Sequence, residues 1–343
     1  MFNPDTFLTI CDSCINVRVR QYTALHNLSR GALGQIVAPR NLRNDRTPLG
    51  ADMPKKVQLS AVRTDILAFF EKQNRRIYDE LELAQIFHQQ RKSWQLSSVI
   101  TVEKFADYLV RRTPMVRHKF SFPRFSPCRY VWEDAPLNEV LLSLKANSYL
   151  SHHSAAFLHG LTEKAPSAHY VTFEQASKQD RRKPITQKEI DDAFSRPVRT
   201  SNNFATFKKQ RVFLLNGMHT GQLGVIHRLR EEGETLSVTN IERTLLDIVV
   251  RPNYAGGVAE ALQAFRLARG RLSTNKLLAT YKQLNFVYPY HQAIGFYLER
   301  AGYGAAAVRA FRALEMKYDF YLDHDMGETT FCRPWRLYIP ANL

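Results

Sequence analysis

The sequence predicts an α+β protein in which helices and a β-hairpin come first and a larger mixed α+β part with a helical C-terminal half follows. The chain has 343 residues, 44% of them hydrophobic, which is enough for two domains at about 100–200 residues per domain. Apolar residues recur at helical spacing between residues 58 and 112, and β-branched and aromatic runs follow. From residue 239 onward the pattern is again mainly helical.

Residues 1–57 differ from the rest of the chain. Gly, Pro and Asn are scattered through residues 1–52 without a sustained hydrophobic period, so we expect an extension that is poorly ordered or only locally helical. The run Met53-Pro54-Lys55-Lys56 opens the first clear structural unit, which makes Met53 an alternative translation start. The intact mass of the protein expressed from its native locus distinguishes the two starts.

Amphipathic helices are expected over residues 58–73, 79–90 and 101–112. Residue types that cap helix N-termini stand near their starts, namely Ser60, Asp79 and Thr101. The side chains expected to point inward from the second helix are Leu81, Ala84, Ile86 and Phe87. Those expected to point inward from the third helix are Val102, Phe105, Ala106 and Leu109.

Two β segments, residues 116–122 and 129–132, flank a turn-rich connection that contains Pro123 and Pro127. Helices followed by a β-hairpin in this order are typical of a winged helix-turn-helix. We therefore expect an N-terminal winged helix-turn-helix DNA-binding domain over residues 58–136, with the hairpin as its wing.

Residues 137–343 predict a mixed α+β domain with a helical C-terminal half. The polar and basic stretch 174–211 is expected to be a long loop or a pair of irregular hairpins, and Thr239 to Glu242 fits a capping box. Helices are expected at 137–150, 155–159 (capped by Ser154 or Ser151), 241–248, 258–269, 274–283, 291–301 and 305–316. Strands are expected at 169–173, 211–215, 223–226, 236–239 and 335–339.

Positive charge is the first indication of function. The chain has 48 Lys and Arg against 32 Asp and Glu, a formal net charge of +16, which favours an anionic partner such as nucleic acid. The excess is sharpest between Arg91 and Arg129, where only Glu103 and Asp107 are acidic. This stretch forms the third helix and the wing, the two elements that a winged helix lays on double-stranded DNA.

The residues of this stretch that are expected to contact DNA have different roles. Lys104, Tyr108 and Arg111 project from the outward face of the third helix toward base edges in the major groove. The residues expected to contact phosphates are Arg112, Arg117 and Lys119, and Arg124 at the hairpin tip is expected to enter the minor groove. Asp107 and Glu103 are awkward beside phosphate, unless they accept a hydrogen bond from a cytosine amino group. Winged-helix domains also serve as protein–protein interaction modules. We favour DNA binding here over that interpretation.

A second basic patch is an alternative anion site. Its candidate residues are Arg181, Arg182, Lys183, Lys208, Lys209 and Arg211. A solvated loop explains Arg181-Arg182-Lys183 equally well, so the two interpretations of that run stay open.

The sequence contains no convincing catalytic, cofactor or metal site. Cys11 and Cys14 have the spacing of half a zinc site, but no second half follows. The histidines 152, 153 and 159 fit cap and core roles, and the acidic residues 319, 323, 325 and 328 fit a solvated turn better than a nuclease centre. No apolar run approaches the length that a membrane span needs. The chain has only four cysteines, which indicates a reducing compartment, so we expect a cytoplasmic protein.

Two long motifs resemble a known family. Residues 149–162 (YLSHHSAAFLHGLT) and 238–247 (VTNIERTLLD) are similar to the two motifs of the AbiEi family antitoxin domain. Residues 256–258, the helix pairs up to 299–302, and the closing run 335–340 continue the similarity. The resemblance covers about residues 58–340, and the winged helix stands where that family places its own.

The resemblance implies the antitoxin of a bacterial toxin–antitoxin pair of the abortive-infection type. Members of the family repress their own operon through the winged helix and counteract a nucleotidyltransferase-like toxin, without need of a stable complex. This chain departs from the family in its N-terminal extension and in its long basic segment 174–211. From the residues themselves we expect structural roles for Glu242 as a cap, for Arg243 with Asp247 as a helical ion pair, and for Gly160 as a helix stop.

Two alternatives remain. The first alternative to an antitoxin is a winged-helix transcription regulator without a toxin partner. The second, less favoured, is a nucleic-acid-processing enzyme whose metal-dependent cleavage depends on Asp319 or Asp323. An adjacent gene for a nucleotidyltransferase argues against the first alternative, and loss of cleavage in Asp319→Ala or Asp323→Ala supports the second.

Overall fold

The computed structural model describes residues 58–177, 183–229 and 235–343. The described residues belong to one compact unit, without a break at residue 136. The predicted extension, the alternative start at Met53, the Cys11–Cys14 pair and the basic residues Arg181 and Arg182 lie outside the described residues.

The first part of this unit has the predicted winged-helix order. Helices α2 (Arg63–Glu71), α3 (Glu80–Gln90) and α4 (Val102–Arg112) precede the hairpin of β2 (Met115–Lys119) and β3 (Cys128–Trp132). The short strand β1 (Ile77–Tyr78) pairs antiparallel with β3, so the small sheet runs β1-β3-β2. Buried faces of the three helices pack together with Trp94, Tyr130 and Trp132 in one hydrophobic cluster.

The predicted helix starts are right in two cases and wrong in one. Asp79 and Glu82 form a complete capping box, and the Thr101 hydroxyl accepts from the Lys104 amide. Helix α2 instead begins after Val62, without a side-chain cap, so Ser60 does not cap it. In α3 the buried positions are Leu83 and Phe87; Leu81, expected inside, is 44% exposed.

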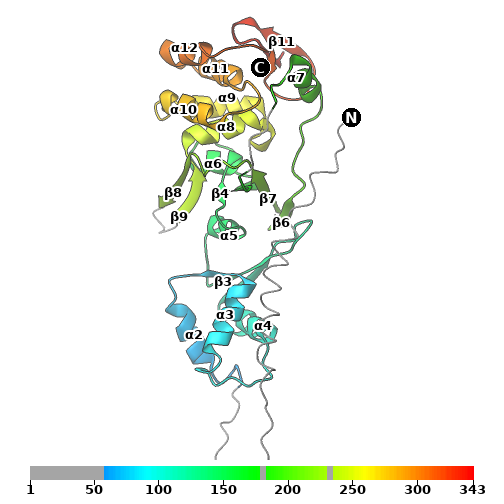
Figure 1. Ribbon diagram of the computed structural model, residues 1–343. Helices are drawn as coiled ribbons and strands as arrows, with labels where there is room; N and C mark the ends of the chain where they lie inside the picture. The colour runs from blue at the N-terminus through cyan, green and yellow to red at the C-terminus, as the bar shows by residue number, and fades with distance from the viewer. Residues whose placement is uncertain (1–57, 178–182, 230–234) are drawn as a thin grey trace, which may run out of the picture. The chain divides into compact units, whose positions relative to one another are not determined.

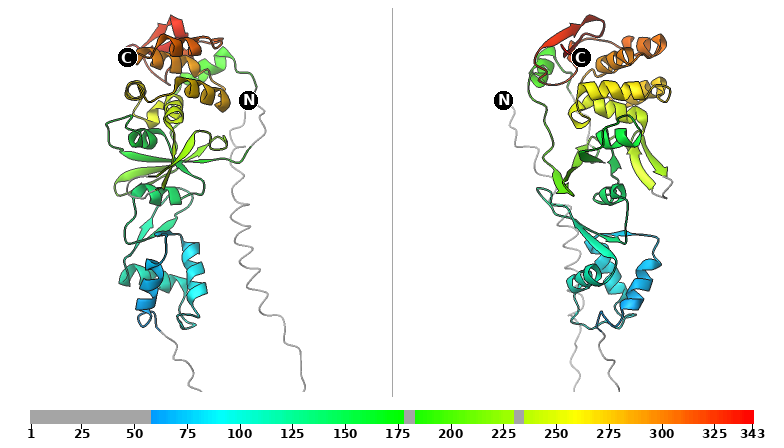
Figure 2. Two further views of the ribbon diagram at one scale, coloured as in Figure 1. Left: turned by 90° about the vertical axis from the view of Figure 1, so that its left-hand side faces the viewer. Right: turned by 180° about the vertical axis from the view of Figure 1, so that it is seen from behind.

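A mixed sheet forms the centre of the second part, in the order β6-β7-β5-β4-β9-β8. Its strands are β4 (Tyr149–Leu150), β5 (Ala168–Glu174), β6 (Phe204–Phe207), β7 (Gln210–Gly217), β8 (Val225–Leu229) and β9 (Thr235–Thr239). The pairs β5–β7 and β4–β9 are parallel, and the other neighbours are antiparallel. Helix α5 (Leu137–Ser143) lies on one face of the sheet, and α6 (His152–Leu158) lies on the other (Figures 1 and 2).

The segment 174–211, predicted to be a long loop or a pair of irregular hairpins, contains a helix and the start of one hairpin. Helix α7 (Gln187–Phe194) begins with a capping box of Thr186 and Glu189, and β6 follows it. Only Ile190 and Phe194 of α7 are buried. Ile190, Ala193 and Phe194 have helical spacing, but they cover a single turn of a short polar helix, which is too little for a recognisable period.

The helical C-terminal half stands as predicted, with corrected boundaries. It consists of α8 (Ile241–Val250), the 3₁₀ turn Pro252–Tyr254, α9 (Val258–Leu267), α10 (Thr274–Leu284), α11 (His291–Arg300) and α12 (Ala305–Arg312). The small sheet β10 (Phe320–Tyr321), β12 (Leu337–Pro340) and β11 (Thr329–Cys332) closes it, so the expected strand 335–339 begins only after Trp335. No described helix is long and apolar enough to span a bilayer.

The expected capping box at residues 239–242 is wrong by one residue. Asn240, not Thr239, caps α8 and accepts from the Arg243 amide at 2.8 Å. The Thr239 hydroxyl bonds to that of Thr244 instead, and Glu242 accepts from the Ser273 amide at the start of α10. Helix α6 likewise begins at His152, before the expected residue 155.

Trp335 fixes the C-terminal sheet against α11 and requires a glycine there. An ideal Cβ on Gly295 would lie 2.1 Å from two ring carbons of Trp335, which is itself fully buried. Gly295→Ala should therefore lower the free energy of unfolding by about 1–3 kcal/mol, because overpacking outweighs the better helix propensity of alanine. Chemical denaturation measures this change.

Gly304 supplies the matched control. It stands at the N-cap of α12 with open space around it. Serine is at least as good a cap as glycine, so Gly304→Ser should leave stability unchanged or slightly higher. A Gly295→Ala protein as stable as wild type would contradict the packing of Trp335.

Candidate nucleic-acid interface

Helix α4 presents a charged outer face. Phe105, Ala106 and Leu109 are buried, while Lys104 and Arg111 are exposed. Tyr108, which we expected to reach base edges, is half-buried and packs against the hydrophobic core. Lys104 and Arg111 are therefore the cations that this face offers to a ligand.

The wing continues this basic surface. Arg117 and Lys119 are exposed on β2, and the hairpin extends beyond the strands through amide–carbonyl bonds from Phe120 to Pro127 and from Phe122 to Phe125, both 3.0 Å. Arg124 is exposed at the tip. We use the name basic face for the exposed cations of α4 and the wing, which are Lys104, Arg111, Arg112, Arg117, Lys119 and Arg124.

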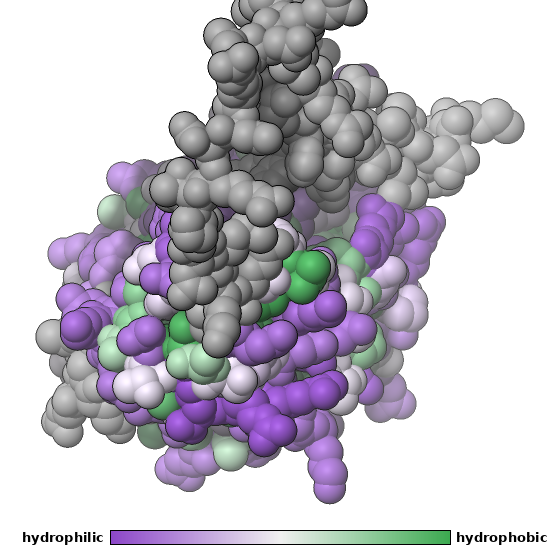
Figure 3. All heavy atoms as spheres, turned by 90° about the horizontal axis from the view of Figure 1, so that it is seen from below, coloured by the Kyte–Doolittle hydropathy of each residue, from purple (hydrophilic) through white to green (hydrophobic). Residues whose placement is uncertain are grey.

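Most charges of the basic face are free to meet an external anion. Only Arg117 forms an ion pair with a described residue, Asp107, at 3.4 Å. In that pair the charge of Arg117 compensates the Asp107 carboxylate, which would otherwise repel a phosphate. Figure 3 views the winged-helix end from below, and the described surface there is largely hydrophilic.

The wing is attached to the sheet of the second part. Phe120 stacks on Phe207 of β6 with ring centroids 4.7 Å apart, and the His118 ring meets the same phenylalanine edge-on at 5.1 Å. Phe120 and Phe122 are buried in one hydrophobic cluster with Ala205 and other residues of the sheet. The hairpin is therefore held at a fixed position instead of projecting freely.

Part of the predicted second patch joins this attachment point. Lys208 and Lys209 are exposed in the turn after Phe207, and Arg211 lies over the Phe204 ring at 5.3 Å. Burial, and next the charge of Lys208, lower the pKa of His118 in the wing. Lys183 is elsewhere, because it precedes α7, whose Gln187 bonds to Asp319. The predicted patch is thus at least two separate groups.

Other basic residues of the stretch 91–129 serve the fold. The buried Arg129 guanidinium donates to the Ser143 carbonyl at 2.7 Å, and Arg91 donates to the Ser97 carbonyl at 2.8 Å. Their donors are directed at backbone oxygens, so neither belongs to the basic face.

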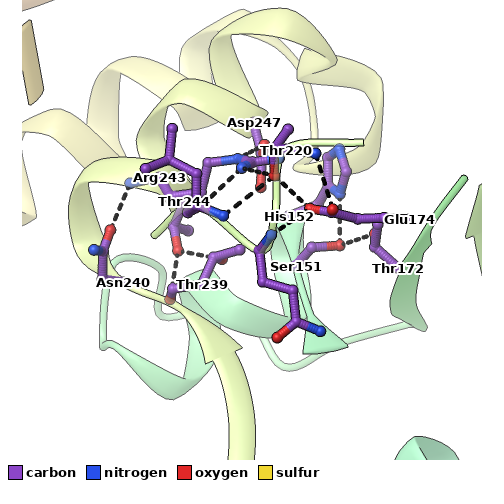
Figure 4. Close-up of polar contacts among 12 residues, drawn as sticks. Ser151, His152, Thr172, Glu174, Thr220, Thr239, Asn240, Arg243, Thr244 and Asp247 are labelled. Atoms are coloured by element: carbon purple, nitrogen blue, oxygen red, sulfur yellow. Dashed lines mark hydrogen bonds and ion pairs between the residues drawn. The ribbon is translucent and has the colours of Figure 1, made fainter. Parts of the chain in front are cut away.

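The two family-like motifs build a buried polar network (Figure 4). Each motif runs from a strand into a helix, β4 into α6 and β9 into α8, and the two strands pair in parallel. Arg243 bonds to Asp247 at 2.8 Å and to the Leu223 carbonyl at 2.8 Å, which confirms the predicted ion pair. Burial by itself lowers the pKa of Arg243, but Asp247 raises it above its ordinary value, so the guanidinium stays charged.

Glu174 connects the same network to the loop between β7 and β8. Its carboxylate accepts from the amides of Thr220 and Gln222 and from the Thr220 hydroxyl, to which Arg243 also reaches. Burial raises the pKa of Glu174, but these hydrogen bonds outweigh burial and lower it. The network therefore orients loop and helix.

Two histidines of the first motif, His152 and His159, have hydrogen-bond partners inside the protein. The Ser151 hydroxyl bonds to His152 Nδ1 at 2.9 Å, and His159 Nε2 contacts the Thr239 carbonyl at 2.6 Å. His152 is buried and holds a left-handed φ of 48°. These contacts fit the expected cap and core roles.

The acidic residues near the C-terminus do not converge. Asp319 accepts from Arg336 at 2.7 Å, and Asp323 accepts from its neighbouring His324 amide. Within residues 58–177, 183–229 and 235–343, no three His, Cys, Asp or Glu side chains lie close enough to share a metal ion.

Comparisons with known proteins give a likeness of fold. No protein-family model and no curated protein sequence matches the chain. Among solved structures, the crystal structure of the Rv2827c protein of Mycobacterium tuberculosis is similar, with 13% sequence identity and a TM-score of 0.51. The match covers 81% of this chain and 91% of that one. The mixed α+β fold is therefore shared with a known structure.

Buried histidines make stability depend on pH. Burial lowers the pKa of His152 and of His291 to about 4, below the unfolded value of about 6.5. Below pH 6.5 the unfolded chain takes up protons that the folded chain does not, so stability is complete above about pH 7 and falls toward pH 4. We expect a loss of about 1.4 kcal/mol per pH unit for each histidine between about pH 6 and 4.

Thermal unfolding at pH 7.5, 6.0, 5.0 and 4.5 measures this slope. The double variant His152→Asn/His291→Gln should show a flatter dependence, and asparagine tolerates the left-handed backbone at residue 152. A double variant with the wild-type slope would contradict the assignment.

Proposed function

We propose that this protein is a DNA-binding antitoxin that represses its own operon through the basic face. The supporting observation is the geometry of α4 and the wing: exposed cations on the outer face of the third helix stand beside a basic hairpin. This pairing of elements matches what a winged helix lays on a duplex.

The charge of the basic face favours duplex DNA over a protein partner. Lys104, Arg111 and Lys119 have no ion pair with any described residue, so binding phosphate breaks no internal contact. Lys104 and Arg111 are the candidates for base contacts, and Arg112, Arg117, Lys119 and Arg124 for phosphates. Neutralising about six phosphates gives a slope of log K against log salt of about −5.

Lys104→Ala/Arg111→Ala should weaken binding to the protein's own upstream DNA by more than about tenfold, since a good base contact contributes about 1–3 kcal/mol. Because both side chains are exposed, the melting temperature should stay nearly unchanged. Gel-shift titrations at two salt concentrations measure affinity and slope together.

The matched control removes the same charge elsewhere. Arg266 in α9 and Lys282 in α10 are also exposed, so Arg266→Ala/Lys282→Ala should bind as wild type does. Equal affinities for wild type and Lys104→Ala/Arg111→Ala would refute the basic face.

The antitoxin part of the proposal is supported by the two strand-to-helix motifs. The polar residues of these motifs bond within the buried network, so the motifs support a similar fold. Contacts that counteract a toxin would then have to come from surface residues of the second part. A transcription regulator without a toxin partner has the same winged helix, and genetics distinguishes the two.

Expression of an adjacent gene for a nucleotidyltransferase-like protein should arrest growth, and co-expression of this chain should restore it. The Lys104→Ala/Arg111→Ala variant should restore growth equally well when both genes are driven by foreign promoters, because operator binding is then irrelevant. Failure of the wild-type chain to restore growth would favour the regulator without a toxin.

A further inference from the structure

The turn between β6 and β7 has an unusual residue pair. Phe207 pairs with Gln210, which leaves Lys208 and Lys209 as a two-residue loop. Their φ angles are 46° and 69°, so both lie in the left-handed region. Such hairpin loops strongly favour Asn-Gly, because most side chains are strained there. Two consecutive lysines are therefore a poor choice for stability.

Local contacts do not explain the two lysines. Lys208 Nζ lies 5.5 Å from the centroid of the Phe207 ring, and such a contact is weak at an exposed site. Neither ammonium forms a hydrogen bond or ion pair with a described residue. Strain that the fold itself does not need is typical of residues kept for a functional contact.

The position of the turn indicates what that contact is. Phe207, directly before the turn, is the residue on which His118 and Phe120 of the wing pack. Lys208 acts electrostatically on His118, with Asp134 acting on the same ring in the opposite sense. The turn therefore stands beside the wing and presents two further cations next to the basic face.

We propose that the Lys208–Lys209 turn is a DNA backbone contact by which the second part of the protein grips the same duplex as the wing. This inference rests on the proposed function, since it needs a duplex at the basic face. Phosphate contacts carry no sequence information, so the turn adds affinity to any duplex and extends the protected region beyond the wing. Two contacts make the salt slope more negative by about 2.

The test replaces the lysines with the residues that the turn prefers. Lys208→Asn/Lys209→Gly should raise the melting temperature by about 2–4 °C, because the strain is relieved. The same variant should bind operator and unrelated duplexes more weakly by one common factor, about tenfold or more near 0.1 M salt, with a slope less negative by about 2. Hydroxyl-radical footprinting should show lost protection at one end of the site.

Two control variants test whether the effect comes from the charge of the turn, and not from its side-chain shape or from the net charge of the protein. Lys208→Arg/Lys209→Arg keeps the charge and should keep the slope and footprint. Lys188→Ala/Arg266→Ala removes two exposed charges from α7 and α9, and should also bind as wild type does.

The outcomes distinguish this inference from the proposed function. If wild type fails to bind any duplex, the proposed function fails and the inference fails with it. If wild type binds while Lys208→Asn/Lys209→Gly keeps its slope and footprint, the turn is no DNA contact and only the inference is overturned. A variant that binds DNA normally but no longer restores growth beside the toxin would overturn it too, and would assign the turn to a protein partner.

Discussion

The attachment of the wing to the sheet is the constraint on which the basic face depends. Phe207 lies against both His118 and Phe120, and the buried side of the hairpin shares a hydrophobic cluster with the strands of the second part. A free wing is positioned by its own small sheet alone, whereas this hairpin is held at both ends. The spacing between the α4 cations and the wing cations is thereby fixed before any ligand arrives, which reduces the entropy lost on binding.

Buried Arg243 has the corresponding role inside the second part. A charge taken out of water needs its counter-charge and hydrogen bonds close by, and Asp247, the Leu223 carbonyl and the Asn240 cap meet that need around the start of α8. In this chain the polar residues of the motif therefore have structural partners within the fold. The motif therefore reports the fold, and the chemistry of function must be sought on the surface.

Short-range rules decided several elements correctly, although the Ser60 cap was wrong and the local capping box of Thr186 and Glu189 was not recognised. The period of α4 and the caps at Asp79 and Thr101 are local properties, and they were predicted correctly. Thr239 and Asn240 are both residue types that cap helices, but Thr239 ends β9 and bonds to Thr244, so Asn240 caps α8. The candidate site needed long-range information, because no local pattern relates Phe207 to the wing or separates Lys208 from Lys183.

Net charge alone would have assigned too many residues to a ligand. Arg129, Arg91 and Arg243 direct their guanidinium donors at backbone carbonyls or a buried carboxylate, so their charges are used within the fold. The cations of α4 and of the β6–β7 turn are exposed and have no such partners among the described residues. Arginine, with five donors in a fixed fork, suits the first task, and lysine at an exposed turn suits a diffuse phosphate backbone. A candidate binding residue in a basic protein is therefore one whose charge has no structural partner. At Lys208 and Lys209 the left-handed backbone adds a second reason, because lysine is also unfavourable there for the fold.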